Sequence, residues 1–85
     1  MTAPSDLHEL AQGRVLIRSG VPRAVRKKLG LSLAEVAASV GVTRSSVLRW
    51  ETGETAPRSA AALRYVAEIR RLRRLAARMP DEVTG

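Results

Sequence analysis

Apolar residues recur at helical spacing along most of the chain, and glycine and proline residues divide this pattern into helix-length segments. The spacing predicts an N-terminal helix over about residues 5–18 and a short helix over residues 22–29. A long pattern without glycine or proline predicts a C-terminal helix over about residues 59–79. We therefore expect an all-α fold: one bundle of about five helices in a single domain over residues 1–85.

The middle of the chain has the pattern of two short helices joined by a tight turn. Ser32 and Glu35 have the spacing of a capping box, in which each side chain accepts the backbone N–H of the other residue. Gly41 marks the turn, and Thr43 can cap a second helix, Arg44–Glu51. The apolar positions expected to face the core are Leu33, Val36, Ala37, Val40, Val47 and Trp50. Such a pair allows one helix to brace the other against a DNA groove.

Composition narrows the classes of partner. The chain is 45% hydrophobic but has no Phe, one Trp and one Tyr, so the core must be largely aliphatic. Fifteen basic residues against eight acidic ones give a net charge of +7, which favours phosphate-bearing partners or anionic lipid. No apolar run is long enough to span a membrane, and nothing resembles a signal peptide.

Candidate chemistry other than binding is sparse. The chain has no cysteine, which excludes disulfides and thiolate metal sites. His8 is the single histidine and has no metal-ligand spacing around it. There is no nucleophile–base pair and no phosphate-binding glycine loop, so we expect neither an enzyme nor a cofactor. A small-molecule ligand is not expected either, because little chain lies beyond the central helices to enclose one.

Residues 30–57 resemble the lambda-repressor/Cro-type helix-turn-helix, also called the xenobiotic response element family. The resemblance rests on the Leu-Ser start, the Glu-Val-Ala triplet, the Gly-Val turn, the hydroxyl-rich start of the second helix, and Arg-Trp-Glu-x-Gly followed by proline. It covers roughly residues 22–68. Two positions depart from the family: Leu33 stands where many members carry a glutamine that contacts the DNA backbone, and Glu54 where a lysine or arginine is usual.

The resemblance implies a role for several residues. Arg44, Ser45 and Arg49 fall where the family reads base edges. Arg26 and Glu51 fall where it often forms a partly buried ion pair. The candidates for phosphate contact are Thr43, Ser46, Ser32, Lys27, Lys28 and Arg58, of which the two lysines can equally belong to an ordinary solvated face.

Along the C-terminal helix the apolar pattern changes phase. Leu63 and Val66 are expected to dock on the core, whereas a second stripe faces nearly the opposite side. That stripe consists of Leu72, Leu75, Ala76 and Met79. Two alternatives stay open for it: packing against the N-terminal helix at Leu7 and Leu10, or forming a homodimer.

The leading functional hypothesis is a regulator that binds a specific double-stranded DNA operator through its helix-turn-helix, most simply as a repressor. Two alternatives are an antitoxin or phage accessory factor whose C-terminal helix holds a protein partner, and an adaptor that does not bind DNA. The expected location is the bacterial cytoplasm or nucleoid, or a phage-infected host.

Overall fold

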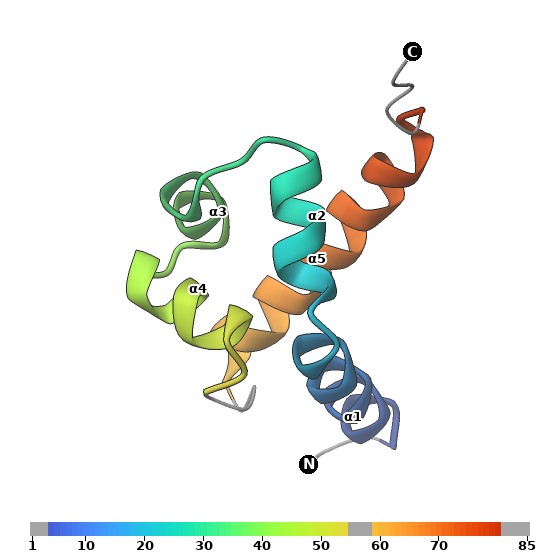
Figure 1. Cartoon of the computed structure of the whole chain (residues 1–85). Helices are drawn as coiled ribbons and strands as arrows, with labels where there is room; N and C mark the ends of the chain where they lie inside the picture. Colours follow the sequence, from blue (N-terminus) through green and yellow to red (C-terminus); the bar gives the residue numbers. More distant parts are fainter. Residues whose placement is uncertain (1–3, 55–58, 81–85) are drawn as a thin grey trace.

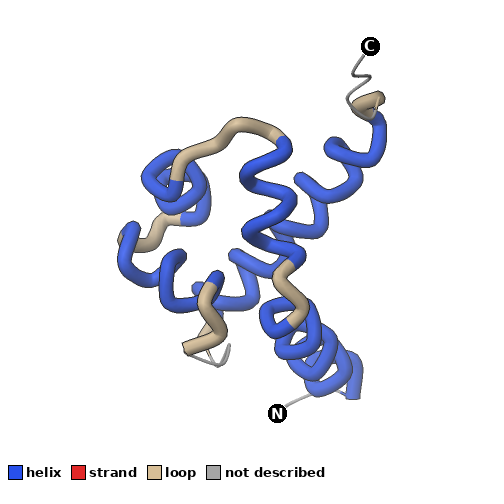
Figure 2. Tube along the Cα trace, viewed as in Figure 1, coloured by secondary structure: helices blue, strands red, loops and turns tan. Residues whose placement is uncertain are grey.

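The computed structural model describes residues 4–54 and 59–80. Within these ranges the chain forms five α-helices and no strand, which confirms the expected all-α fold (Figures 1 and 2). The helices are α1 (Pro4–Arg18), α2 (Val21–Lys28), α3 (Leu33–Val40), α4 (Arg44–Glu51) and α5 (Ala60–Arg78). None of these helices is both long and apolar enough to cross a membrane.

Side-chain caps fix where the central helices begin. Ser32 accepts a hydrogen bond from the backbone N–H of Glu35, whose carboxylate accepts the N–H of Ser32, so the expected capping box is present. Thr43 and Ser59 cap α4 and α5 through their hydroxyls, which accept the backbone N–H of Ser46 and of Ala62. Between α3 and α4, Gly41 adopts φ 83°, a left-handed conformation that an L side chain strains to adopt. The turn therefore requires glycine for its backbone conformation.

The core lies between α5 and the other helices. Val47 and Tyr65 are fully buried, and Ile69 is 1% exposed. Side chains from α1, α3 and α4 complete the cluster: Leu16, Ile17, Val36, Ala37, Val40 and Trp50. Helix α5 serves as the axis of the bundle, because α1, α2 and α3 pack along it and α4 contacts it through Trp50.

The buried face of α5 is one continuous stripe, not the two opposing stripes expected. Tyr65 and Ile69 lie between the residues that the sequence pattern assigned to separate faces, and both belong to the core. The buried residues of the stripe are Ala62, Tyr65, Val66, Ile69 and Ala76, and Leu72 is partly buried against the core between them. Val66 docks on the core as expected, whereas Leu63 is only partly buried. The expectation of two opposing stripes was wrong because it left out Tyr65 and Ile69. Leu72 and Ala76 consequently pack within the chain.

Helix α1 lies alongside the first half of α5. Gln12 accepts a hydrogen bond from Arg70 at 3.1 Å, and Glu9 borders the same surface hollow as Leu63. Farther along α5, Leu75 and Met79 stay 51% and 40% exposed, respectively. The structure therefore does not show the second stripe packed against Leu7 and Leu10; Leu7 is itself 63% exposed.

Candidate nucleic-acid interface

Helix α4 is anchored through its inner face. Val47 is fully buried and Trp50 is 7% exposed. The Trp50 ring stacks on Tyr65 of α5 with ring centroids 4.7 Å apart and an interplanar angle of 27°. The Tyr65 hydroxyl has no hydrogen-bond partner among the described residues, and burial raises the pKa of Tyr65 well above its usual range. Tyr65 therefore contributes to this anchor as an aromatic ring.

The outer face of α4 presents polar and basic side chains to solvent. Arg44, Ser45 and Arg49 are exposed, and neither arginine side chain makes a hydrogen bond or ion pair within the described part of the chain. A guanidinium that is not already paired can offer its fork of N–H groups to a guanine edge. The structure thus places the three expected base-reading residues together on one exposed face.

Leu48 lies on this same face and was not singled out from the sequence. It is 43% exposed, in the helical turn between Arg44 and Arg49. An apolar side chain in this position can contact the methyl group of thymine. The sequence did hold a signal for Leu48, because it lies four residues, or one helical turn, after Arg44 and so on the same face of α4.

The first turn of α4 combines hydroxyl groups with backbone donors. Thr43 Oγ1 accepts the N–H of Ser46 at 3.1 Å and donates to Ser46 Oγ at 3.0 Å. The first N–H groups of a helix have no partner within it and favour an anion such as phosphate. Thr43 and Ser46 therefore order the end of α4 that a DNA backbone would approach.

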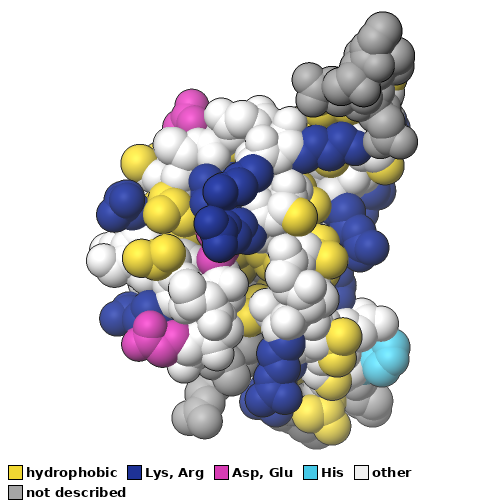
Figure 3. Space-filling model, viewed as in Figure 1, with side chains coloured by type: hydrophobic (Ala, Val, Ile, Leu, Met, Phe, Trp, Pro, Cys, Tyr) yellow, Lys and Arg dark blue, Asp and Glu magenta, His cyan; other side chains and the backbone are white. Residues whose placement is uncertain are grey.

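The remaining candidates for phosphate contact lie on other elements. Ser32 is exposed at the start of α3, and its hydrogen bonds hold the pKa of Glu35 below its usual value. Lys27 and Lys28 are exposed in the last turn of α2, and Arg58 lies outside the described residues. In Figure 3, Lys and Arg side chains lie over the middle and the left edge of the view, where α2 and α4 are found.

An ion pair ties the end of α4 to α2. Arg26 Nε donates to Glu51 Oε2 at 2.5 Å and Arg26 Nη2 donates to Glu51 Oε1 at 3.0 Å. In addition, Arg26 Nη1 donates a hydrogen bond of 2.9 Å to the backbone carbonyl of Leu31 in the loop before α3. The two side chains are 13% and 3% exposed. The hydrogen bond to Glu51 raises the pKa of Arg26, although burial opposes it, so the guanidinium stays charged.

Other kinds of chemistry find no support in this arrangement. No group of three or more histidine, cysteine, aspartate or glutamate side chains in residues 4–54 and 59–80 is placed to hold a metal ion. The exposed functional groups of α4 itself are hydroxyls and guanidinium groups. These groups bind phosphates and base edges.

A family model described as helix-turn-helix, of the lambda repressor/Cro type, matches residues 23–71. The matched segment contains α3 and α4 and most of α2, and it ends within α5. No curated protein and no solved structure matches the chain.

The Arg26–Glu51 pair predicts unequal effects for two glutamates near the end of α4. Glu51→Ala should lower the free energy of unfolding by about 3–5 kcal/mol, because it leaves the Arg26 guanidinium without its buried partner. Glu54→Ala, at an exposed position, should change it by about 0–1 kcal/mol. Urea denaturation of both variants at neutral pH measures the difference. Equal, small losses would contradict the structural role of the pair.

Proposed function

The chain belongs to the lambda repressor/Cro-type helix-turn-helix family of DNA-binding domains, and we propose that it is a sequence-specific repressor of transcription whose helix α4 enters the major groove. The observation that carries this proposal is the division of α4 into two faces. One face is held in the core by Val47 and Trp50, and the other presents unpaired arginines to solvent. A rigidly anchored helix with a free polar face suits base recognition, because hydrogen bonds to base edges require fixed geometry.

We assign two kinds of DNA contact. Arg44, Ser45 and Arg49 read base edges, and Leu48 adds an apolar contact between the arginines. The groups that hold the phosphate backbone are Thr43, Ser46, Ser32, Lys27, Lys28 and Arg58. Glu54 is exposed just beyond α4, and its negative charge would disfavour a phosphate contact at this end of the helix.

We further propose that the repressor acts as a homodimer, in the cytoplasm of a bacterium or of a phage-infected host. A single module of this size buries little DNA surface, and a second copy about 34 Å away along the duplex adds an equal set of contacts. Leu75 and Met79 support this arrangement, because they stay exposed near the end of α5 after Leu72 and Ala76 have packed inward. The dimer contact is therefore narrower than the four-residue stripe expected from the sequence.

Arg49→Ala should reduce affinity for the selected operator by about 1–3 kcal/mol and relax the preference at one base pair, because a bidentate contact to guanine is lost. Lys27→Ala is the matched loss of one positive charge on α2. It should weaken binding evenly across sequences and lower the salt dependence by about one charge. Selection from a random duplex pool, followed by titration at two salt concentrations, measures both effects. If Arg49→Ala selects the same DNA motif and binds it with unchanged affinity, α4 is not the helix that reads the bases.

Leu75→Glu combined with Met79→Glu should separate the two copies without unfolding either, because both side chains are exposed. Loss of the second module should weaken binding to a palindromic site by roughly 100-fold and leave binding to a half-site unchanged. Sedimentation at micromolar concentration, with and without DNA, gives the oligomeric state directly. An unmutated protein that stays monomeric in both conditions contradicts the dimer.

A further inference from the structure

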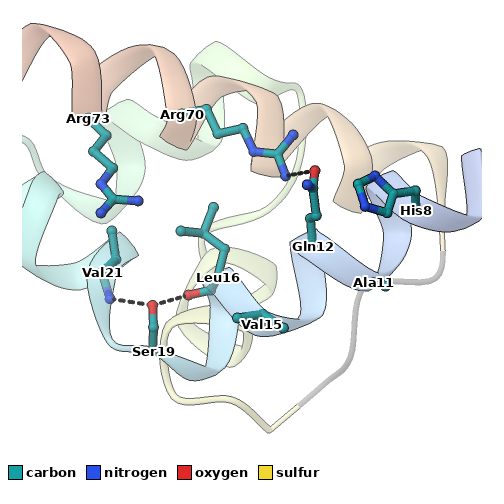
Figure 4. A pocket seen from close by; sticks show the side chains of 9 residues that line it. All are labelled: His8, Ala11, Gln12, Val15, Leu16, Ser19, Val21, Arg70 and Arg73. Carbon is teal, nitrogen blue, oxygen red and sulfur yellow. Dashed lines mark hydrogen bonds between the residues drawn. The ribbon is translucent and has the colours of Figure 1, made fainter. Parts of the chain in front are cut away.

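Helices α1 and α5 flank an open groove that takes no part in the proposed DNA interface (Figure 4). Its volume is about 490 Å³. Val15, Leu16 and Val21 supply apolar lining, and Arg70 and Arg73 border it from α5. The helix α1, together with Val21 and Arg73, lies outside the segment matched by the family model. The family resemblance therefore does not account for this groove.

The groove continues into an exposed apolar surface on α1. Val15 borders the groove and is 70% exposed. Ala11 and Leu7, spaced four residues apart on the same side of α1, are also exposed, and Leu7 has 63% of its surface in solvent. Figure 3 shows an apolar strip over α1 between basic side chains and the single histidine. Large apolar side chains that stay exposed together mark a surface for a partner.

Positive charge borders this apolar surface. Arg70 Nη2 donates to Gln12 Oε1, whereas the Arg73 side chain has no hydrogen bond or ion pair with any described residue. Arg18 is exposed at the end of α1. The residues that line the groove include no acidic side chain. A ligand that covers the apolar strip would therefore gain most by carrying negative charge at its edges.

The shape of the groove favours a helix over a small molecule. Its α1 side runs from His8 to Ser19, a length of about 16 Å, or three helical turns. Small-molecule sites bury most of their ligand. A compact ligand on this strip would stay largely exposed to solvent, because Val15 itself is 70% exposed. A second copy of this chain would bring a further set of arginines against Arg70 and Arg73. We propose that the groove binds an amphipathic helix of a partner protein, with acidic residues flanking its apolar face.

The test uses a fluorescein-labelled 16-residue helical peptide with leucine at every third or fourth position, glutamate on both flanks and alanine elsewhere. Fluorescence anisotropy should give a dissociation constant of about 10 µM. Val15→Asp and Arg73→Glu should each weaken binding by about 10-fold or more, because one removes the apolar contact and the other reverses the charge beside it. The sister peptide with lysine in place of glutamate should not bind.

Two matched variants separate the groove from general attraction to a basic protein. Ala77→Asp places the same charge at another exposed apolar site, and Arg78→Glu makes the same charge change elsewhere on α5. Both should bind the acidic peptide within about twofold of the unmutated protein. The proposal would be overturned if these two variants lost as much affinity as Val15→Asp and Arg73→Glu. It would also be overturned if the unmutated protein did not bind the peptide at 500 µM, roughly 50-fold above the expected dissociation constant. DNA binding by Val15→Asp should be unchanged, so a failure here is distinguishable from a failure of the proposed function.

Discussion

The position of α4 depends on the ion pair between Arg26 and Glu51. Glu51 is the last residue of α4, where the helix dipole disfavours a carboxylate. With its side chain 3% exposed, it is also cut off from the water that would otherwise stabilise it. The positive charge of Arg26 offsets both the unfavourable helix dipole and the loss of water around the Glu51 carboxylate. Its guanidinium also donates to the carbonyl of Leu31. One guanidinium therefore joins the end of α2, the loop before α3 and the end of α4.

The stack of Trp50 on Tyr65 fixes α4 from a second direction. The ion pair holds the end of α4 to α2, while the stack holds its inner face to α5. Together they limit both the tilt of α4 and its rotation about its own axis. This matters because side chains that read base edges must be held to within a fraction of an ångström, and a small rotation of α4 would redirect Arg44 and Arg49 together. The groove between α1 and α5 lies outside these contacts, so a ligand bound there would not disturb them.

Local signals in the sequence were sufficient to locate the central helices. The Ser32–Glu35 capping box, Gly41 and Thr43 each act within a few residues, and α4 begins and ends at the predicted residues. The resemblance supplied the Arg26–Glu51 pair, because no local pattern links residues 25 positions apart. The packing of α5 could not be predicted in the same way. Its phase depends on how the other helices pack against it, and Tyr65 is buried by a cluster that includes Trp50 of α4 and side chains of α1 and α3. The groove was missed for a similar reason, since it forms only when α1 and α5 meet.

The most direct test of the account is the DNA specificity of Arg26→Lys, measured below its unfolding temperature. Lysine keeps the charge beside Glu51 but lacks the planar fork that reaches Glu51 and Leu31 together. If this fork positions α4, affinity for the selected operator should fall by roughly 10-fold or more while affinity for unrelated duplex stays unchanged. Operator affinity equal to that of the unmutated protein would show that the reading face of α4 does not depend on Arg26.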